Sequence, residues 1–199
     1  MEDIIARHEV GHFIALCAAG LYDEFVSITN QETIYNERLV EGLTLRNGNS
    51  LTEYGQRITQ LSGDQVFDFM RTEGRPIVLK NSCYFFGGGS IDRFYKDAST
   101  SRNAIDDSNN IAMLKAIGIT NVSPARYQDL QNMVDEFLHP VFEANMKLIQ
   151  VLIDQLSGLK TINKAKMEEL KQKLKEDNLT FPCQDEKFDE LLVKFNGWC

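Results

Sequence analysis

The sequence predicts a mainly α-helical protein with a small β-hairpin or sheet, an α+β fold built as a helical bundle. Apolar residues recur at helical spacing through most of the chain. Alternating, β-branched residues of the kind that form strands are confined to residues 25–45. A length of 199 residues with 43% hydrophobic residues suits one domain with a buried core. We therefore expect a domain over residues 1–175 and a C-terminal tail with a short helix over residues 176–199.

The composition argues against nucleic-acid and membrane partners. The formal net charge of −8 is opposite in sign to that of a nucleic-acid-binding surface, and it gives no attraction to anionic lipid. No signal peptide is visible, and the longest apolar run, Phe13–Tyr22, is too short to span a bilayer. The four cysteines form no CxxC pair, which indicates a reducing compartment. We expect a cytoplasmic protein.

The first element is expected to be a buried helix. It begins after Glu2 and Asp3, whose negative charges favour a helix N-terminus, and Gly20 marks its end. Its apolar residues surround most of the helix, so it should be central rather than superficial. Two strands follow, Phe25–Thr29 and Leu39–Leu45.

The middle of the chain combines a helical and an irregular stretch. Residues 51–70 fit helical spacing, with an interruption near Ser62-Gly63. Residues 71–100 contain glycines, Pro76 and several aromatic residues, and we expect an irregular insertion or lid there. The Gly87–Ser90 run is not a phosphate loop, because no helix with a suitably spaced lysine follows it.

The rest of the chain is predicted to be a series of helices. Residues 103–117 form the first, with Asp106 and Asp107 in its opening turn. The later signals are a start at Ser123-Pro124, a break or kink at Pro140, an end at Gly158, a cap at Asn163 and a tail after Pro182.

The motif with the clearest chemistry is His8-Glu9-Val10-Gly11-His12. Residues four apart lie on one face of a helix, so both histidines can reach one metal ion. Glu9 is rotated by about 100° from His8, which lets it contact a metal-bound water without binding the metal. Imidazole suits zinc, and a catalytic zinc has three protein ligands and a water. The bare motif also fits two ordinary histidines that flank a helical glutamate.

A third metal ligand has to come from elsewhere in the chain. The remaining histidine, His139, precedes a proline at a predicted helix end, where a helix dipole would favour it without any metal. Residues 13–21 contain no acid, and no Gly-x-x-His follows His12. A more distant carboxylate is therefore the expected ligand.

The order of these features resembles the peptidase domain of the FtsH-type ATP-dependent zinc proteases. Their His-Glu-Ala-Gly-His helix matches residues 8–12, and their Gly-Tyr-Thr strand resembles Gly42-Leu43-Thr44. Their Gly-Arg-x-Ala-Glu-Glu helix is loosely similar to Gly63–Asp68. The resemblance covers residues 4–175, and the metal helix is its specific part.

The resemblance implies an aspartate at a helix start as the third zinc ligand. The matching segment is Ala104–Ser108, which makes Asp107 the ligand, with Asp106 as the alternative after a shift of one residue. Leu114 lies on the Asp107 face and would pack on the core. Both acids would otherwise serve only to cap the helix.

The expected function is that of a zinc metalloendopeptidase, a hydrolase in which Glu9 is the general base and His8, His12 and Asp107 bind Zn²⁺. The substrate would be a peptide or an unfolded protein. A strand near the metal helix of such enzymes pairs with extended substrate, although Phe25–Leu45 could equally be a structural hairpin. No ATPase domain or membrane helix is present, so a separate ATPase or a homo-oligomer would supply unfolding. The alternative is a catalytically inactive binding or regulatory protein with a metallopeptidase fold.

Overall fold

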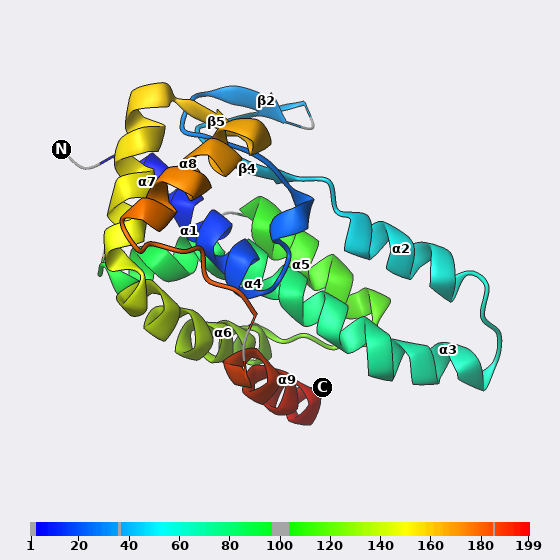
Figure 1. The fold of residues 1–199 in the computed structure, drawn as a ribbon. Helices are drawn as coiled ribbons and strands as arrows, with labels where there is room; N and C mark the ends of the chain where they lie inside the picture. Colours follow the sequence, from blue (N-terminus) through cyan, green and yellow to red (C-terminus); the bar gives the residue numbers. More distant parts are fainter. Residues whose placement is uncertain (1–2, 36, 97–103, 185) are drawn as a thin grey trace.

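A computed structural model describes residues 3–35, 37–96, 104–184 and 186–199 (Figure 1). It is mainly helical with a small sheet, which confirms the predicted fold class. In chain order the elements are α1 (Ile4–Ala18), the 3₁₀ turn η1 (Tyr22–Glu24), β1 (Phe25–Thr29), β2 (Thr33–Tyr35), β3 (Arg38–Val40), β4 (Leu43–Arg46), α2 (Asn49–Ile58), α3 (Asp64–Phe69), the π turn η2 (Met70–Gly74), α4 (Arg75–Phe94), α5 (Ala104–Ala116), α6 (Pro124–Ala144), α7 (Met146–Leu159), β5 (Thr161–Asn163), α8 (Lys164–Glu176) and α9 (Glu186–Trp198).

Helix α1 is the centre of the molecule, as its all-round apolar sequence predicts. Asp3 caps its N-terminus, because the carboxylate accepts a hydrogen bond from the Ala6 amide over 2.9 Å. Gly20 has a φ of +73° and ends the helix in a Schellman motif, with the Leu21 amide donating to the Leu16 carbonyl. The helix packs along α4 on one side and contacts α7, β1 and β4 on others. Every residue from Val10 to Ala19 is buried.

The prediction of an irregular insertion over residues 71–100 is wrong for residues 75–94. These form α4, a helix of 20 residues that lies against α1. The glycines that suggested a loop serve close packing instead, since a Cβ at Gly87 would lie 2.7 Å from the Ala15 Cβ. The packing of two helix backbones offsets the low helix propensity of glycine. Residues 97–100 fall outside the described residues.

The three-stranded sheet has the order β4-β1-β5, and all its pairs are antiparallel. The strand predicted at Phe25–Thr29 is confirmed as β1. The partner predicted at Leu39–Leu45 is divided at Gly42: β4 pairs with β1, whereas β3 pairs with β2 in a separate hairpin. β4 is thus an edge strand, and its second edge pairs with no strand among the described residues.

The helical signals downstream are mostly confirmed. Gly63, with a φ of +56°, separates α2 from α3, and the side chains of Ser123 and Asn163 cap α6 and α8. The expected break at Pro140 is wrong as an end of the helix, because α6 continues through the proline to Ala144. The predicted tail helix is α9, which packs on α6 and α4.

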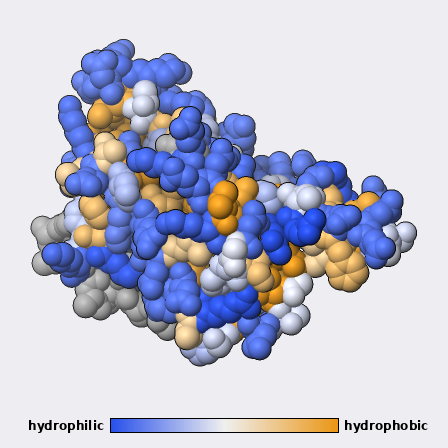
Figure 2. Space-filling model, turned by 90° about the horizontal axis from the view of Figure 1, so that it is seen from below, coloured by the Kyte–Doolittle hydropathy of each residue, from blue (hydrophilic) through white to orange (hydrophobic). Residues whose placement is uncertain are grey.

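The arm formed by α2 and α3 extends to one side of the body, away from α7 and α8 (Figure 1). Figure 2 shows a face on which hydrophilic residues predominate and the hydrophobic residues form scattered groups. Within the described parts of the chain, no helix combines the length and the apolar composition needed to cross a bilayer.

Candidate metal centre

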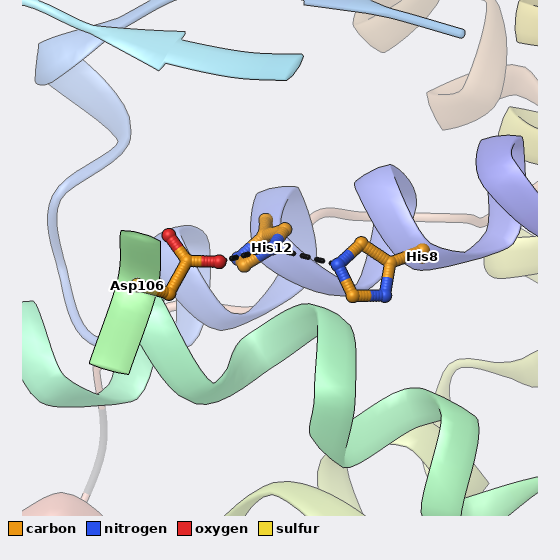
Figure 3. A group of neighbouring side chains, drawn as sticks. All are labelled: His8, His12 and Asp106. Carbon is orange, nitrogen blue, oxygen red and sulfur yellow. Dashed lines mark hydrogen bonds and ion pairs between the residues drawn. The ribbon is translucent and has the colours of Figure 1, made fainter. Parts of the chain in front are cut away.

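The two histidines of the motif project from α1 and bring their ring nitrogens together. Their Nε2 atoms are 3.2 Å apart, and the rings meet edge to face with centroids 4.9 Å apart. His12 is almost fully buried, whereas 16% of the His8 side chain is exposed. Figure 3 shows His12 between His8 and a third residue, Asp106 of α5.

Helix α4 comes close to this pair through Gly88. A Cβ at this position would lie 2.5 Å from the His12 Nε2 and even closer to the His8 Nε2. Only glycine therefore leaves room for both rings where they stand. The two imidazole rings fill the space that a side chain at Gly88 would need.

The other nitrogen of each ring is already bonded. His8 Nδ1 is 2.6 Å from the Oδ2 atom of Asp92, and His12 Nδ1 is 2.7 Å from the backbone carbonyl oxygen of Tyr84. Both partners accept hydrogen bonds, so each Nδ1 is the donor, and a neutral ring in this tautomer presents the lone pair of its Nε2. Metal-binding histidines are oriented in this way, with the second nitrogen donating to a carboxylate or carbonyl.

The acidic pair at the start of α5 divides between two environments. Asp106 Oδ2 lies 3.7 Å from His12 Nε2, and the ligand atoms of His8, His12 and Asp106 all lie within 4.8 Å of one another. Asp107, the residue that the resemblance favoured, accepts a hydrogen bond of 2.8 Å from the Tyr127 hydroxyl. Successive helical residues are about 100° apart, so only one of the two can face the histidines. His139 lies on α6 beside Asp135 and Phe94, outside this cluster.

Glu9 lies on the side of α1 that faces β4. The Thr44 hydroxyl is 2.8 Å from its Oε2 atom and 2.9 Å from its backbone carbonyl oxygen. A Cβ at Gly42, the residue before β4, would lie 2.8 Å from the Oε1 atom, so the backbone at the start of β4 packs directly against this carboxylate. Burial raises the pKa of Glu9 to about 7, although the nearby His12 and the Thr44 hydroxyl oppose the shift. A carboxylate with a pKa near neutrality can both take and release a proton.

A cleft of about 380 Å³ opens beside these groups. Glu9, His12 and Asp106 line it, together with all four residues of the edge strand β4. Apolar and aromatic residues make up much of the rest: Tyr35 and Val40 of the hairpin, Leu43 and Leu45 of β4, Leu51 of α2, and Tyr84 and Phe85 of α4.

One cation, Arg46, also lines the cleft. Its guanidinium donates to Glu24 over 2.6 Å and to the Asn81 side chain, and it lies over the Tyr84 ring at 4.9 Å. The Tyr84 hydroxyl in turn donates to the Thr44 carbonyl oxygen. These contacts tie β4 to α4 across the end of the cleft.

Sequence reasoning did not find three of these residues: Asp92, Tyr84 and Gly88. All belong to α4, which was predicted to be irregular. The spacing of Gly88 and Asp92 is the one signal in the sequence for these residues. On a helix, residues four apart share a face, so recognition of α4 would have placed the two together. The segment compared with the glycine-led acidic helix, Gly63–Asp68, instead lies in the α2–α3 arm.

The donor set fits a zinc ion. Ligand atoms about 2.0–2.1 Å from a tetrahedral zinc are about 3.3 Å from one another. Two of the spacings here are 3.2 Å and 3.7 Å, and all three ligand atoms lie within 4.8 Å of one another. Two imidazole nitrogens and one carboxylate leave a fourth position, as in catalytic rather than structural zinc sites. His12 and Asp106 line the cleft, which gives a water or a substrate access to this group of ligand atoms.

Comparison of the chain with protein-family models, with curated proteins and with solved structures gave no match.

Proposed function

We propose that this protein is a zinc-dependent metallopeptidase that cleaves peptide bonds within an extended chain. The observation that supports it most is the joint placement of three ligand atoms, from His8, His12 and Asp106, close to a buried glutamate that lines a cleft. The resemblance of residues 8–12 to the FtsH-type peptidases agrees with it.

Each residue has a role in the proposed reaction. His8, His12 and Asp106 would hold the zinc ion, which would supply a Lewis acid for the scissile carbonyl and for a water molecule. Glu9 accepts the proton of that water as it attacks and passes the proton to the leaving amine. Asp92 and the Tyr84 carbonyl keep the histidine rings in the tautomer that presents Nε2. Thr44 holds the Glu9 carboxylate in one orientation.

The substrate is proposed to be an extended peptide or an unfolded protein that adds to the edge of β4. An unpaired strand edge offers backbone donors and acceptors to an added strand. β4 fits this role because it lines the cleft and contacts Glu9 through Thr44. A folded protein could not present a strand in this way, so a separate ATPase or a homo-oligomer is proposed to deliver substrates.

A cytoplasmic location is part of the same proposal. All four cysteines are free thiols, and two of them, Cys17 and Cys83, are buried. Burial raises the pKa of both thiols, which keeps them protonated and unreactive. Unpaired cysteines are usual in a reducing compartment.

The test is to compare the wild-type protein with Glu9→Gln. The wild type should bind about one zinc and cleave an unstructured fluorogenic peptide in a chelator-sensitive manner. Glu9→Gln should keep the zinc and lose about 10²–10⁴-fold in kcat, the usual contribution of a general base. Glu73→Gln, which changes an exposed glutamate of η2 that pairs with Arg57, is the matched control and should behave as the wild type.

Two results would contradict the proposal. If the wild-type protein binds no zinc, the proposed metal centre does not exist. Bound zinc without cleavage of any peptide in a library of unstructured sequences would leave the inactive binding or regulatory protein in its place.

A further inference from the structure

Asp107 belongs to a polar cluster on a different face of α5 from Asp106. Its carboxylate accepts the hydrogen bond from Tyr127 of α6. Burial and this hydrogen bond both raise the pKa of Tyr127, so the hydroxyl remains a proton donor. The Tyr127 ring also contacts the Phe86 ring of α4, with centroids 5.4 Å apart.

A second hydrogen bond of the cluster joins α5 to α4. The hydroxyl of Ser82 donates to the Asn110 side chain over 2.7 Å, and neither residue is exposed to solvent. Asn110 also contacts Tyr127. The first two turns of α5 are thereby bonded to both α4 and α6 through side chains alone.

These contacts bear directly on Asp106 because of helix geometry. Asp107 and Asn110 are three residues apart and share a face with Leu114, which is fully buried. Asp106 is turned by about 100° from that face, which directs it to His12. The amides in the first turn of a helix have no intrahelical partners, so this turn is more easily displaced and side-chain contacts help to hold it in place.

We infer that Asp107 is a positioning residue, and that its hydrogen bond with Tyr127 fixes the rotation of α5 so that Asp106 can bind the metal. This inference rests on the proposed zinc site. It assigns Tyr127 and Asp107 the role of orienting Asp106, without contact between either residue and the metal.

The experiment measures zinc affinity by competition with a chromophoric chelator. Tyr127→Phe should weaken zinc binding by about 10-fold, which is the usual effect of removing a residue that orients a metal ligand. Asp107→Asn should bind zinc almost as the wild type, because its amide oxygen still accepts the Tyr127 hydrogen bond. Asp106→Asn should lose far more affinity than either variant.

Tyr54→Phe is the matched control. The Tyr54 hydroxyl contacts the same helix at its other end, at the carbonyl of Ala116. Loss of this hydroxyl should leave zinc affinity unchanged. An effect as large as that of Tyr127→Phe would show that the loss of any contact to α5 weakens zinc binding, and it would overturn the inference. Wild-type affinity in Tyr127→Phe, or a loss in Asp107→Asn equal to that in Asp106→Asn, would also overturn it.

Failure of the inference and failure of the proposed function give different results. A wild-type protein that binds no zinc contradicts the proposed function. Amide hydrogen exchange of α5 in the metal-free protein then still tests the positioning role: Tyr127→Phe should speed exchange in residues 106–110, and Tyr54→Phe should not.

Discussion

The helix that carries the two histidines and the helix that carries Asp106 are held in the protein by different kinds of contact. From Glu9 to its end, α1 is buried around its whole circumference, and it packs backbone to backbone against α4 through Gly11 and Gly87. α5 packs on α4 through one apolar face, and its first turns are held by the hydrogen bonds of Asp107 and Asn110.

This difference indicates which side of the proposed metal centre is rigid and which side can shift. Close packing leaves α1 no room to rotate, because interiors are packed as densely as crystals. A side-chain hydrogen bond contributes about 0.5–1.5 kcal/mol, so the α5 side can be displaced more easily. Changes on the α1–α4 side should therefore affect zinc binding most.

The largest effect is expected for Gly88→Ala. The added methyl group would overlap the Nε2 atoms of both histidines, so one or both rings must leave the site. Zinc affinity should fall by more than about 100-fold, beyond the range for loss of an outer partner. Isothermal titration of the metal-free protein measures this.

The adjacent glycine supplies the control for that change. At Gly89 a Cβ would meet only the end of the Arg93 side chain, at 3.1 Å. Gly89→Ala should keep wild-type zinc affinity and raise the free energy of unfolding by up to about 1 kcal/mol, because alanine favours the helix. Equal zinc affinity in the two variants would show that α4 does not shape the metal centre.

A smaller effect is expected for Asp92→Asn, which weakens the acceptor on His8 Nδ1. Zinc affinity should fall by about 10–100-fold. Asp135→Asn is the matched control, since Asp135 pairs with Arg93, the next residue of α4, at 2.7 Å and lies away from the histidines. If both variants bind zinc like the wild type, Asp92 does not orient His8.

The smallest effect is expected for Thr44→Val, which removes the hydroxyl that contacts Glu9 and keeps a β-branched residue in β4. Zinc content should not change, because Thr44 contacts no ligand, whereas kcat should fall by about 10-fold for the loss of a hydrogen bond to a charged group. Thr44→Ser should restore most of the activity. A rise in KM at constant kcat would instead indicate that Thr44 binds substrate.

The same contrast explains what the sequence could predict. The spacing of His8 and His12, the caps at Ser123 and Asn163 and the strand Phe25–Thr29 depend on neighbours in the chain, and the structure has them as predicted. The choice between Asp106 and Asp107 depends on Tyr127, a contact across 20 residues that no local pattern contains. We expected the metal ligand on the face of α5 that packs on the core. In the structure Asp107, the acid on that face, accepts the hydrogen bond of Tyr127.

The missed helix α4 has a related cause. Three consecutive glycines have low helix propensity, and the close packing of α1 against Gly87 and Gly88 offsets it. Strand β5 was missed because three residues carry no pattern, and it forms only by pairing with β1.

The most direct test of the account is a crystal structure of the protein grown with zinc, with anomalous scattering measured at the zinc absorption edge. The account predicts one zinc peak between the two Nε2 atoms of His8 and His12, with an Asp106 carboxylate oxygen about 2.0–2.2 Å away. Asp107 should remain bonded to Tyr127. A peak coordinated by Asp107, or no peak at the histidines, would contradict it.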